Sequence, residues 1–264
     1  MALAWLLTHR APPPKPSTEL TQKRLTFNSS ENAVQSSAIS PDGKYLAYSD
    51  AAGIHVKLLS TGDERVIPRP AGVPAGADWG VSSWFPDGTQ LLAGTYEPGG
   101  HLSMWTVPVL GQSPRELRDG AGGFEVSPDG TRIAFTPTVA SGYIRELWVM
   151  SSQGDNPQKA LSLGENEWLY SAHWSPDGQR LAYIKGHRTP ERYEWSIETC
   201  NPKGTDRTVV VPYTELWLRD FCWLPSGRIV YSRHESPGSN DENFWEVAVD
   251  SQAATASGKP KRIT

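Results

Sequence analysis

Short apolar runs recur along the chain, and each follows a tight turn of the Pro-Asp-Gly type. The turns are Pro41-Asp42-Gly43, Pro86-Asp87-Gly88, Pro128-Asp129-Gly130, Pro176-Asp177-Gly178 and Pro225-Ser226-Gly227. The apolar runs after them occupy residues 45–48, 91–93, 133–135, 181–183 and 229–231. Runs of this kind, bounded by turn residues, are typical of β-strands. The prolines lie 45, 42, 48 and 49 residues apart, so the pattern is a repeat of long period.

Two more runs complete each repeat. A run centred on Trp lies 19 or 20 residues after the proline, at Trp105, Trp148, Trp195 and Trp245, whereas the first repeat has Val56. A turn containing Gly follows, and after it a fourth run occupies residues 65–67, 115–117, 159–161, 208–211 and 262–264. With the strand before each Pro turn, every repeat has four short strands. The pattern predicts an all-β fold, a β-propeller of four-stranded antiparallel blades with five units present.

The turn residues have a framework role in this interpretation. Pro sets the first corner of the turn, Asp bonds its own backbone, and Gly takes the left-handed position before a bulge. Ser40, Ser127 and Ser175 offer a further acceptor at the start of three turns. A catalytic carboxylate is not expected five times over, nor replaced by Ser226. The Trp residues, with Trp84, Trp174 and Trp223 before the turns, are expected to pack between blades.

The chain divides into an N-terminal segment and the repeats. Residues 1–23 form an apolar remnant and a Pro-rich linker, and residues 24–264 carry the propeller blades. The units are about 24–70, 71–119, 120–163, 164–212 and 213–264. Ala2–Leu7 is shorter than the ~20 residues that cross a bilayer. Two interpretations remain: the end of a transmembrane helix, or a frayed terminus with no structural role. The Pro-rich stretch after it predicts an extended spacer.

Both ends of the repeat region carry a similar element, Arg24-Leu25-Thr26 and Arg262-Ile263-Thr264. Each is predicted to be an outer fourth strand. Because the fifth unit already has its own fourth strand, the first element has no blade to complete. We therefore expect one to three further blades, in a ring of six to eight, and the alternative is a closed ring of five.

Composition changes the picture in two respects. The net charge is −4, and no stripe of Lys and Arg is present, so this segment is not expected to bind nucleic acid. Cys200 and Cys222 are too few for a disulfide framework. Both are expected to be small buried hydrophobes, and a single bridge between them is the alternative.

Motifs of catalysis and metal binding are missing from the sequence. It contains no Gly-x-Ser-x-Gly, His-Glu-x-x-His, Cys-x-x-Cys or phosphate-binding Gly-rich loop, and its six His are scattered. We therefore predict no catalytic residue, no metal ligand and no cofactor, and a protein that is not an enzyme.

A ligand site is expected where loops enter the first strands, at the mouth of the propeller channel. The aromatic and charged residues of these loops are Asp78, Trp79, Glu167, Trp168, Tyr170, Trp217 and Arg219. They predict a surface for a protein, peptide or glycan ligand. The alternative is that the loop aromatics fold over the ends of the blades and only complete the core.

The stretch "SPDGKYLAYS", with "RLTF" before the first unit and "KPKRIT" closing the last, resembles the TolB-like β-propeller family. The resemblance spans residues 24 to 264 and is specific for architecture. The stretches 38–62 and 220–247 are also similar to propellers of bacterial membrane-anchored signalling proteins, in which a cytoplasmic Ser/Thr kinase or winged-helix domain precedes one transmembrane helix and the propeller follows outside the membrane.

This resemblance implies a non-enzymatic recognition or sensor module, extracytoplasmic and membrane-anchored through the N-terminus. A cytoplasmic location stays open. Two alternatives remain as well: the gating propeller of a prolyl-oligopeptidase-like peptidase without its catalytic domain, and a soluble periplasmic TolB-like scaffold.

Overall fold

The computed structural model describes residues 23–74, 76–139, 143–250 and 255–264. Among them it contains one 3-10 turn, η1 (Ser30–Asn32), and twenty β-strands in five sheets. Each sheet has four antiparallel strands in sequence order, so every strand pairs with the one that precedes or follows it. The predicted all-β fold of five four-stranded blades is confirmed.

The blades follow the repeats. Blade 1 contains β1 (Ser36–Ile39), β2 (Tyr45–Asp50), β3 (Gly53–Leu58) and β4 (Glu64–Ile67). Blade 2 contains β5 (Asp78–Trp84), β6 (Gln90–Tyr96), β7 (Leu102–Pro108) and β8 (Arg115–Asp119). Blade 3 contains β9 (Ala121–Val126), β10 (Arg132–Pro137), β11 (Glu146–Ser151) and β12 (Gln158–Ser162). Blade 4 contains β13 (Glu167–Trp174), β14 (Leu181–Arg188), β15 (Tyr193–Cys200) and β16 (Thr208–Thr214). Blade 5 contains β17 (Leu218–Trp223), β18 (Arg228–His234), β19 (Glu242–Ala248) and β20 (Lys261–Arg262).

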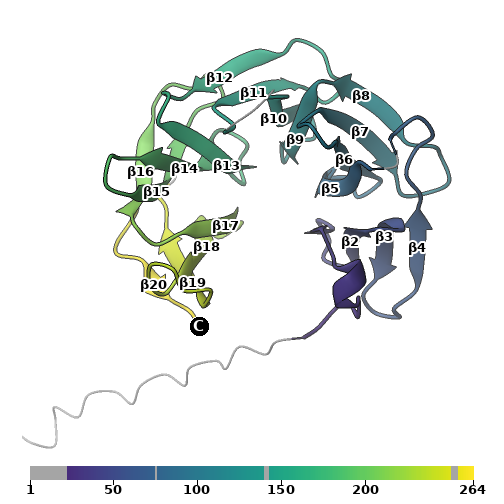
Figure 1. Cartoon of the computed structure of the whole chain (residues 1–264), viewed down its shortest axis with the longest axis horizontal. Helices are drawn as coiled ribbons and strands as arrows, with labels where there is room; N and C mark the ends of the chain where they lie inside the picture. The colour runs from purple at the N-terminus through teal and green to yellow at the C-terminus, as the bar shows by residue number, and fades with distance from the viewer. Residues whose placement is uncertain (1–22, 75, 140–142, 251–254) are drawn as a thin grey trace, which may run out of the picture.

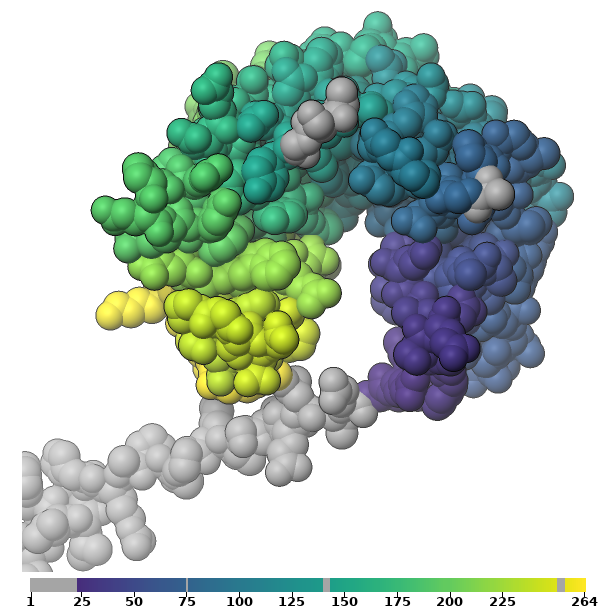
Figure 2. Space-filling view, in the orientation of Figure 1, coloured from purple at the N-terminus to yellow at the C-terminus, as the bar shows by residue number. Residues whose placement is uncertain are grey.

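The five blades are arranged around a central channel, with the first strand of each blade innermost (Figure 1). Each inner strand contacts the inner strand of the next blade. Within the described residues, β17 and β1 share no comparable contact. The molecule is open between blades 5 and 1, as the space-filling view shows (Figure 2). The expectation of further blades stays a prediction.

Four apolar clusters fill the spaces between consecutive blades. Neighbouring residues of a strand point to opposite faces, so Leu91 packs toward blade 1 and Leu92 toward blade 3. Both are fully buried, and burial of such a side chain contributes about 1.5–3 kcal/mol. The tryptophans of the repeat lie in or against these clusters, which confirms their expected place between blades.

The Pro-Asp-Gly turns have the predicted geometry. Gly43 has a φ of 71°, and Gly227, after Ser226, has a φ of 76°. Asp42 Oδ1 accepts hydrogen bonds from Ser40 Oγ (2.7 Å) and from the backbone N–H of Lys44 (3.1 Å). These bonds stabilise the carboxylate and lower the pKa of Asp42 to about 2. The turns therefore build the hairpins, and their carboxylates are already engaged.

One predicted outer strand is absent from the described structure. Arg24–Thr26 forms no strand and pairs with none, so that prediction is wrong, whereas β20 confirms its counterpart at the other end. Instead, the segment lies against blade 1. Lys57 Nζ donates to the Leu25 carbonyl (3.2 Å), and the Asn28 and Asn32 side chains donate to Asp50 Oδ2. These side-chain contacts hold the N-terminal segment against blade 1 without backbone pairing to a strand.

Both cysteines are free thiols, so the alternative of a bridge is wrong. Cys200 is buried in the core between blades 3 and 4, as expected. The expected burial is wrong for Cys222, because β17 places it on the wall of the central channel, where it is exposed.

None of the helical segments within the described ranges has the length and apolar character required to cross a bilayer.

Candidate functional site

Aromatic side chains form a continuous patch at one end of blades 3 to 5, here called the aromatic surface. They come from the loop before β11, the starts of β13 and β15, the residue before β17 and the end of β18. The members are Tyr143, Trp168, Tyr170, Tyr193, Trp195, Trp217 and His234.

Contacts between rings link the whole patch. Tyr143 stacks on Trp168 with the ring centroids 4.5 Å apart, and Trp168 meets the edge of Tyr193 at 5.8 Å. Tyr193, Trp195 and Trp217 then form a row, with centroid spacings of 6.3 and 6.5 Å and planes inclined by 31° and 32°. Such offset ring pairs contribute about 0.5–1.5 kcal/mol beyond their burial. The rings therefore hold one another in place.

Part of the aromatic surface is open to solvent. Tyr170 is 41% exposed, Tyr193 43% and Trp217 39%, whereas Trp168 is only 3% exposed. Trp168 thus serves as the floor, and the other three rings present free faces. Large exposed aromatic groups gathered in one place are characteristic of binding surfaces.

A groove of about 490 Å³ runs beside the row of three rings. Its opposite wall is the loop 236–240 between β18 and β19. At its rim, Arg192 Nη1 lies 2.8 Å from Glu215 in an ion pair, and His234 Nε2 lies 3.5 Å from Glu242. The groove has the size of a small-ligand or peptide site.

The seven sequence-predicted residues fall into three groups. Trp168, Tyr170 and Trp217 come together in the aromatic surface. Asp78 and Trp79 lie on β5 of blade 2, away from that surface. Trp79 is 1% exposed and packs edge-on against Trp105 in the core of blades 1 and 2, as the alternative interpretation expected. Asp78 is exposed and accepts a hydrogen bond from Gln35.

The two remaining predicted residues, Glu167 and Arg219, are held in ion pairs. Glu167 lies 3.3 Å from Lys185 and accepts from the Gly164 N–H, and Arg219 lies 2.9 Å from Glu242. Burial opposes ionisation of Glu167, but Gly164 and Lys185 outweigh it and lower the pKa of its carboxyl. These pairs support the loops around the aromatic surface.

Four members of the surface were not predicted: Tyr143, Tyr193, Trp195 and His234. A signal was present for two of them, because Tyr193 and Trp195 are two residues apart on one strand and so share a face. Trp195 was assigned to the core, and it is indeed half-buried there. No sequence signal relates Tyr143 or His234 to the others, since they meet only through blade packing.

A cluster of polar side chains, separate from the aromatic surface, lines the central channel. His173 on β13 lies 3.5 Å from Glu125 on β9 and 3.7 Å from Asp220 on β17. Ser171 Oγ approaches both His173 Nε2 and Asp220 Oδ1 at 3.0 Å. Burial disfavours the imidazolium, but Asp220 and Glu125 outweigh it and raise the pKa of His173 to about 10. The charged imidazole therefore bridges three consecutive blades, beside a cavity of about 650 Å³.

Comparisons with known proteins agree with this architecture. No family model matches the chain. The Tol-Pal system protein TolB of Anaeromyxobacter dehalogenans is 39% identical over 83 residues, which are 30% of this chain and 18% of that protein. Among solved structures, a TolB-type protein from Agrobacterium tumefaciens superposes with a TM-score of 0.67 and 14% identity, covering 88% of this chain and 81% of the other. The chain is a TolB-like β-propeller.

Other solved structures with the fold of this TolB-like propeller include a second TolB and two enzymes. TolB from Acinetobacter baumannii has a TM-score of 0.61 at 18% identity, over 84% of this chain and 53% of the other. An oligogalacturonate lyase in complex with manganese has a TM-score of 0.62 at 17% identity, and a prolyl endopeptidase 0.58 at 14%. At these identities the likeness shows the fold alone. The TolB sequence matches cover less than a fifth of those relatives.

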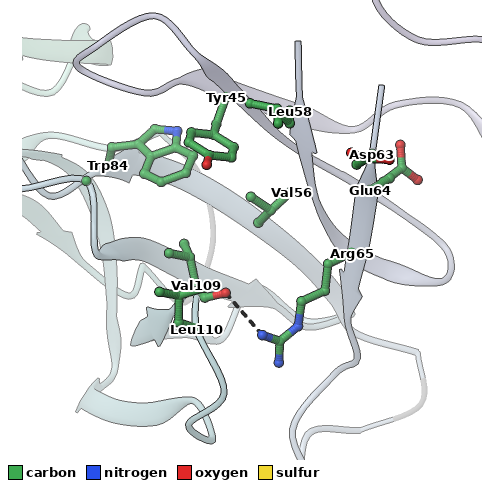
Figure 3. Close-up of a pocket in the computed structure, with 10 residues that line it drawn as sticks. Tyr45, Val56, Leu58, Asp63, Glu64, Arg65, Trp84, Val109 and Leu110 are labelled. Carbon is green, nitrogen blue, oxygen red and sulfur yellow. Dashed lines mark hydrogen bonds between the residues drawn. The ribbon is translucent and has the colours of Figure 1, made fainter. Parts of the chain in front are cut away.

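The TolB-like propeller has a further cavity, of about 370 Å³, between blades 1 and 2 (Figure 3). Its lining is mostly apolar, with Val56, Val109 and the ring of Tyr45 directed toward the space, and Asp63, Glu64 and Arg65 add charged groups (Figure 3). Arg65 crosses from β4 and donates to the Val109 carbonyl at 3.2 Å. The groove is therefore bridged by the protein's own side chain.

Metal binding has no visible basis in the part of the chain that the structure describes, because no group of three or more His, Cys, Asp or Glu there is placed to hold an ion.

Proposed function

We propose that this propeller is a non-enzymatic recognition module whose ligand site is the aromatic surface. The observation that carries the proposal is the row Tyr193–Trp195–Trp217, fixed by ring contacts and half-open to solvent beside a groove of about 490 Å³. Rigid aromatic rings provide a large contact area at a low entropic cost. The ligand is a protein, a peptide or a glycan.

A binding assay on arrays of peptides and glycans tests the proposal. Labelled protein is expected to bind a subset of spots, and Tyr170→Ala or Trp217→Ala should weaken this binding at least about tenfold, because exposed aromatic anchors dominate interface energies. Tyr96→Ala is the matched control, since Tyr96 is 54% exposed and lies on blade 2. Binding that none of the surface variants weakens, or chemical turnover of the bound ligand, would contradict the proposal.

The cellular setting belongs to the same proposal. The resemblance to TolB supports an extracytoplasmic location, and the resemblance to membrane-anchored signalling proteins supports a sensor joined to a kinase or winged-helix domain. An alkaline phosphatase fused to the C-terminus is expected to be active only if the propeller is outside the cytoplasm. An inactive but stable fusion would place the propeller inside.

A TolB-like periplasmic scaffold is the second candidate, favoured by the sequence matches to Tol-Pal TolB. The gating propeller of a peptidase is the third, since a prolyl endopeptidase shares the fold. The intact reading frame distinguishes them: a kinase or winged-helix domain indicates signalling, and a Ser/His/Asp domain indicates a peptidase.

A further inference from the structure

We propose that residues 23–35 are a built-in cap, which occupies the face of blade 1 where a neighbouring blade would otherwise pack and so keeps the ring open at that end. This face borders the opening between blades 5 and 1, and the segment lies along it (Figure 1). The cap is independent of the aromatic surface, which lies on blades 3 to 5. Three observations support it: the burial of the face, the residues that replace the packing positions of the repeat, and the bonds that the segment makes.

The face of blade 1 beside the opening is buried although no blade packs on it. Side chains alternate along a strand, and Ala47 and Ile54 belong to the core shared with blade 2. Leu46, Tyr48 and His55 therefore point to the opposite face. Their exposed fractions are only 5%, 5% and 8%, and the opening separates them from blade 5 (Figure 2). The cover of this face must therefore come from outside the blades.

Two positions on this face differ from the rest of the repeat. Across β2 and β3, Leu46 pairs with Lys57, and Tyr48 pairs with His55. The equivalents of Lys57 and His55 in the other blades are Val107 and Trp105, Met150 and Trp148, Cys200 and Glu198, and Val247 and Trp245. Among the five blades described, blade 1 is thus the one in which neither residue is apolar. A polar outer face is characteristic of the terminal unit of a repeat array.

The segment bonds to the polar groups of this face. Asn28 Nδ2 and Asn32 Nδ2 donate to Asp50 Oδ2 at 2.9 and 3.0 Å. Asn32 Oδ1 also accepts from a backbone N–H of the turn between β2 and β3 at 3.0 Å. Lys57 Nζ donates to the Leu25 carbonyl at 3.2 Å. The segment and the face are therefore complementary in hydrogen bonding, and one of these bonds is made by the lysine that replaces a core residue of the other blades.

Blade 1 holds the acceptor of the two asparagines in place. His55 lies between two carboxylates, with Nε2 2.9 Å from Asp50 Oδ1 and Nδ1 2.7 Å from Glu64 Oε1. Tyr48 stacks on His55 with the ring centroids 4.5 Å apart and donates to Glu64. Burial opposes ionisation of Asp50, but His55 and the Ala52 N–H outweigh it and lower the pKa of its carboxyl. Asp50 is therefore an ionised acceptor, and hydrogen bonds to a charged group are the stronger ones.

The other end of the open ring has no such cover. Phe244 on blade 5 borders the opening and is 51% exposed. Blade 1 is therefore the capped end, and blade 5 is the end at which a further blade or a partner protein finds a free face. A neighbouring blade can pack against blade 1 only after the segment has left.

Acetylation footprinting of the full chain tests the cap. Lys57 is bonded to the segment and its side chain is 19% exposed, whereas that of Lys44 on the same blade is 70% exposed. Acetic anhydride, with mass spectrometry as the readout, is expected to modify Lys57 more slowly than Lys44. Asn28→Ala/Asn32→Ala should raise the rate at Lys57 relative to Lys44 at least about threefold, because it removes both bonds to the charged Asp50.

Asn243→Ala is the matched control, since Asn243 lies on blade 5 and donates to Glu235. It should leave the rate at Lys57 unchanged. Asn28→Ala alone removes one bond and should give a smaller rise, and circular dichroism establishes that each variant is folded. An unchanged rate in the folded double variant, or in Asn28→Ala if only that variant folds, overturns the proposal. Protection of wild-type Lys57 that is lost on dilution from about 100 µM to about 1 µM also overturns it, because a second copy would then be the cover.

Discussion

Single glycines set the hairpin geometry on which each blade depends. Gly43 has a φ of 71°, in the region that residues with a Cβ disfavour, and it ends a turn in which Asp42 and Ser40 are already bonded. A Cβ added at Gly43 would meet no atom within 4 Å. The requirement for glycine therefore comes from the backbone alone.

Substitution of Gly43 tests this requirement. Gly43→Ala is expected to lower the free energy of unfolding by about 1–2 kcal/mol, the usual cost of a left-handed conformation for an L residue. Gly43→Asn should lose less, because Asn tolerates this conformation better. Urea unfolding of the three proteins provides the measurement, and equal midpoints would contradict the backbone argument.

His173 is the second residue whose chemistry reaches beyond its own strand. Its pKa is raised from about 6.5 to about 10 because, despite burial, Asp220 and Glu125 stabilise the imidazolium. A raised pKa means that the folded state holds the proton more tightly than the unfolded state. The resulting stability is complete below pH 6.5 and is lost as the pH rises toward 10.

The prediction is a pH-dependent difference between wild type and His173→Gln. Thermal unfolding between pH 6 and pH 10 should show the wild-type Tm falling toward that of the variant as the imidazolium deprotonates. The variant corrects for other groups that titrate in this range. A constant Tm difference across the range would show that His173 contributes by packing and not by charge.

Within blade 4, one lysine ties all four strands together. Lys185 on β14 lies 2.5 Å from Glu198 on β15 and 3.3 Å from Glu167 on β13, and it sits 5.2 Å from the ring centroid of Tyr213 on β16. The side chains of Lys185 and Glu198 are 12% and 8% exposed. Glu198 also accepts a hydrogen bond from Tyr183. Such a pair is well bonded, and removal of either partner would leave the charge of the other one buried without compensation.

Removal of one partner should therefore be costly. Lys185→Met is expected to lower the free energy of unfolding by about 3–5 kcal/mol, since it leaves Glu198 buried without a counter-charge. The double variant Lys185→Met/Glu198→Leu should recover much of this loss, because it buries no charge. Denaturant unfolding measures both. A double variant less stable than the single one would show that the network stabilises blade 4 in its own right.

At the scale of the whole molecule, the face of blade 5 that borders the opening of the ring differs from the equivalent faces of blades 2 and 3, which pack against the next blade. Met104 and Leu147 directly precede the Trp of the third strand and are fully buried against the next blade. Phe244 has the same place in blade 5, beside the opening of the ring, and is 51% exposed. The same repeat position is thus core in one blade and surface in another.

A pair of substitutions measures that difference. Leu147→Ala should cost about 2–5 kcal/mol of stability, the usual range for a fully buried leucine. Phe244→Ala should change stability by no more than about 0.5 kcal/mol in dilute protein, as exposed substitutions usually do. A large loss for Phe244→Ala would mean that the face is covered in solution, and analytical ultracentrifugation would then show whether a second copy covers it.

The blade pattern was predictable because it depends on neighbours in sequence. Pro41, Asp42 and Gly43 form their turn from their own backbone bonds, and the alternation of Leu91 and Leu92 follows from the strand itself. The failures concern contacts between distant segments. Arg24–Thr26 resembles an outer strand, but side chains of blade 1 hold it elsewhere. Cys222 lies in an apolar run, but its side chain faces the channel whereas that of Phe221 beside it is buried.

The sequence alone therefore determined the repeat, the four strands of each unit, the turns and the tryptophans between blades, because these features depend on local periodicity and local hydrogen bonding. Only the tertiary structure decided which aromatic side chains form a surface. It buried Trp79, brought Tyr193 and Trp195 beside Trp217, and joined Glu125, His173 and Asp220 across three blades. The physical reason is that blade packing sets these distances, and no local pattern encodes which side chain of one blade faces which side chain of the next.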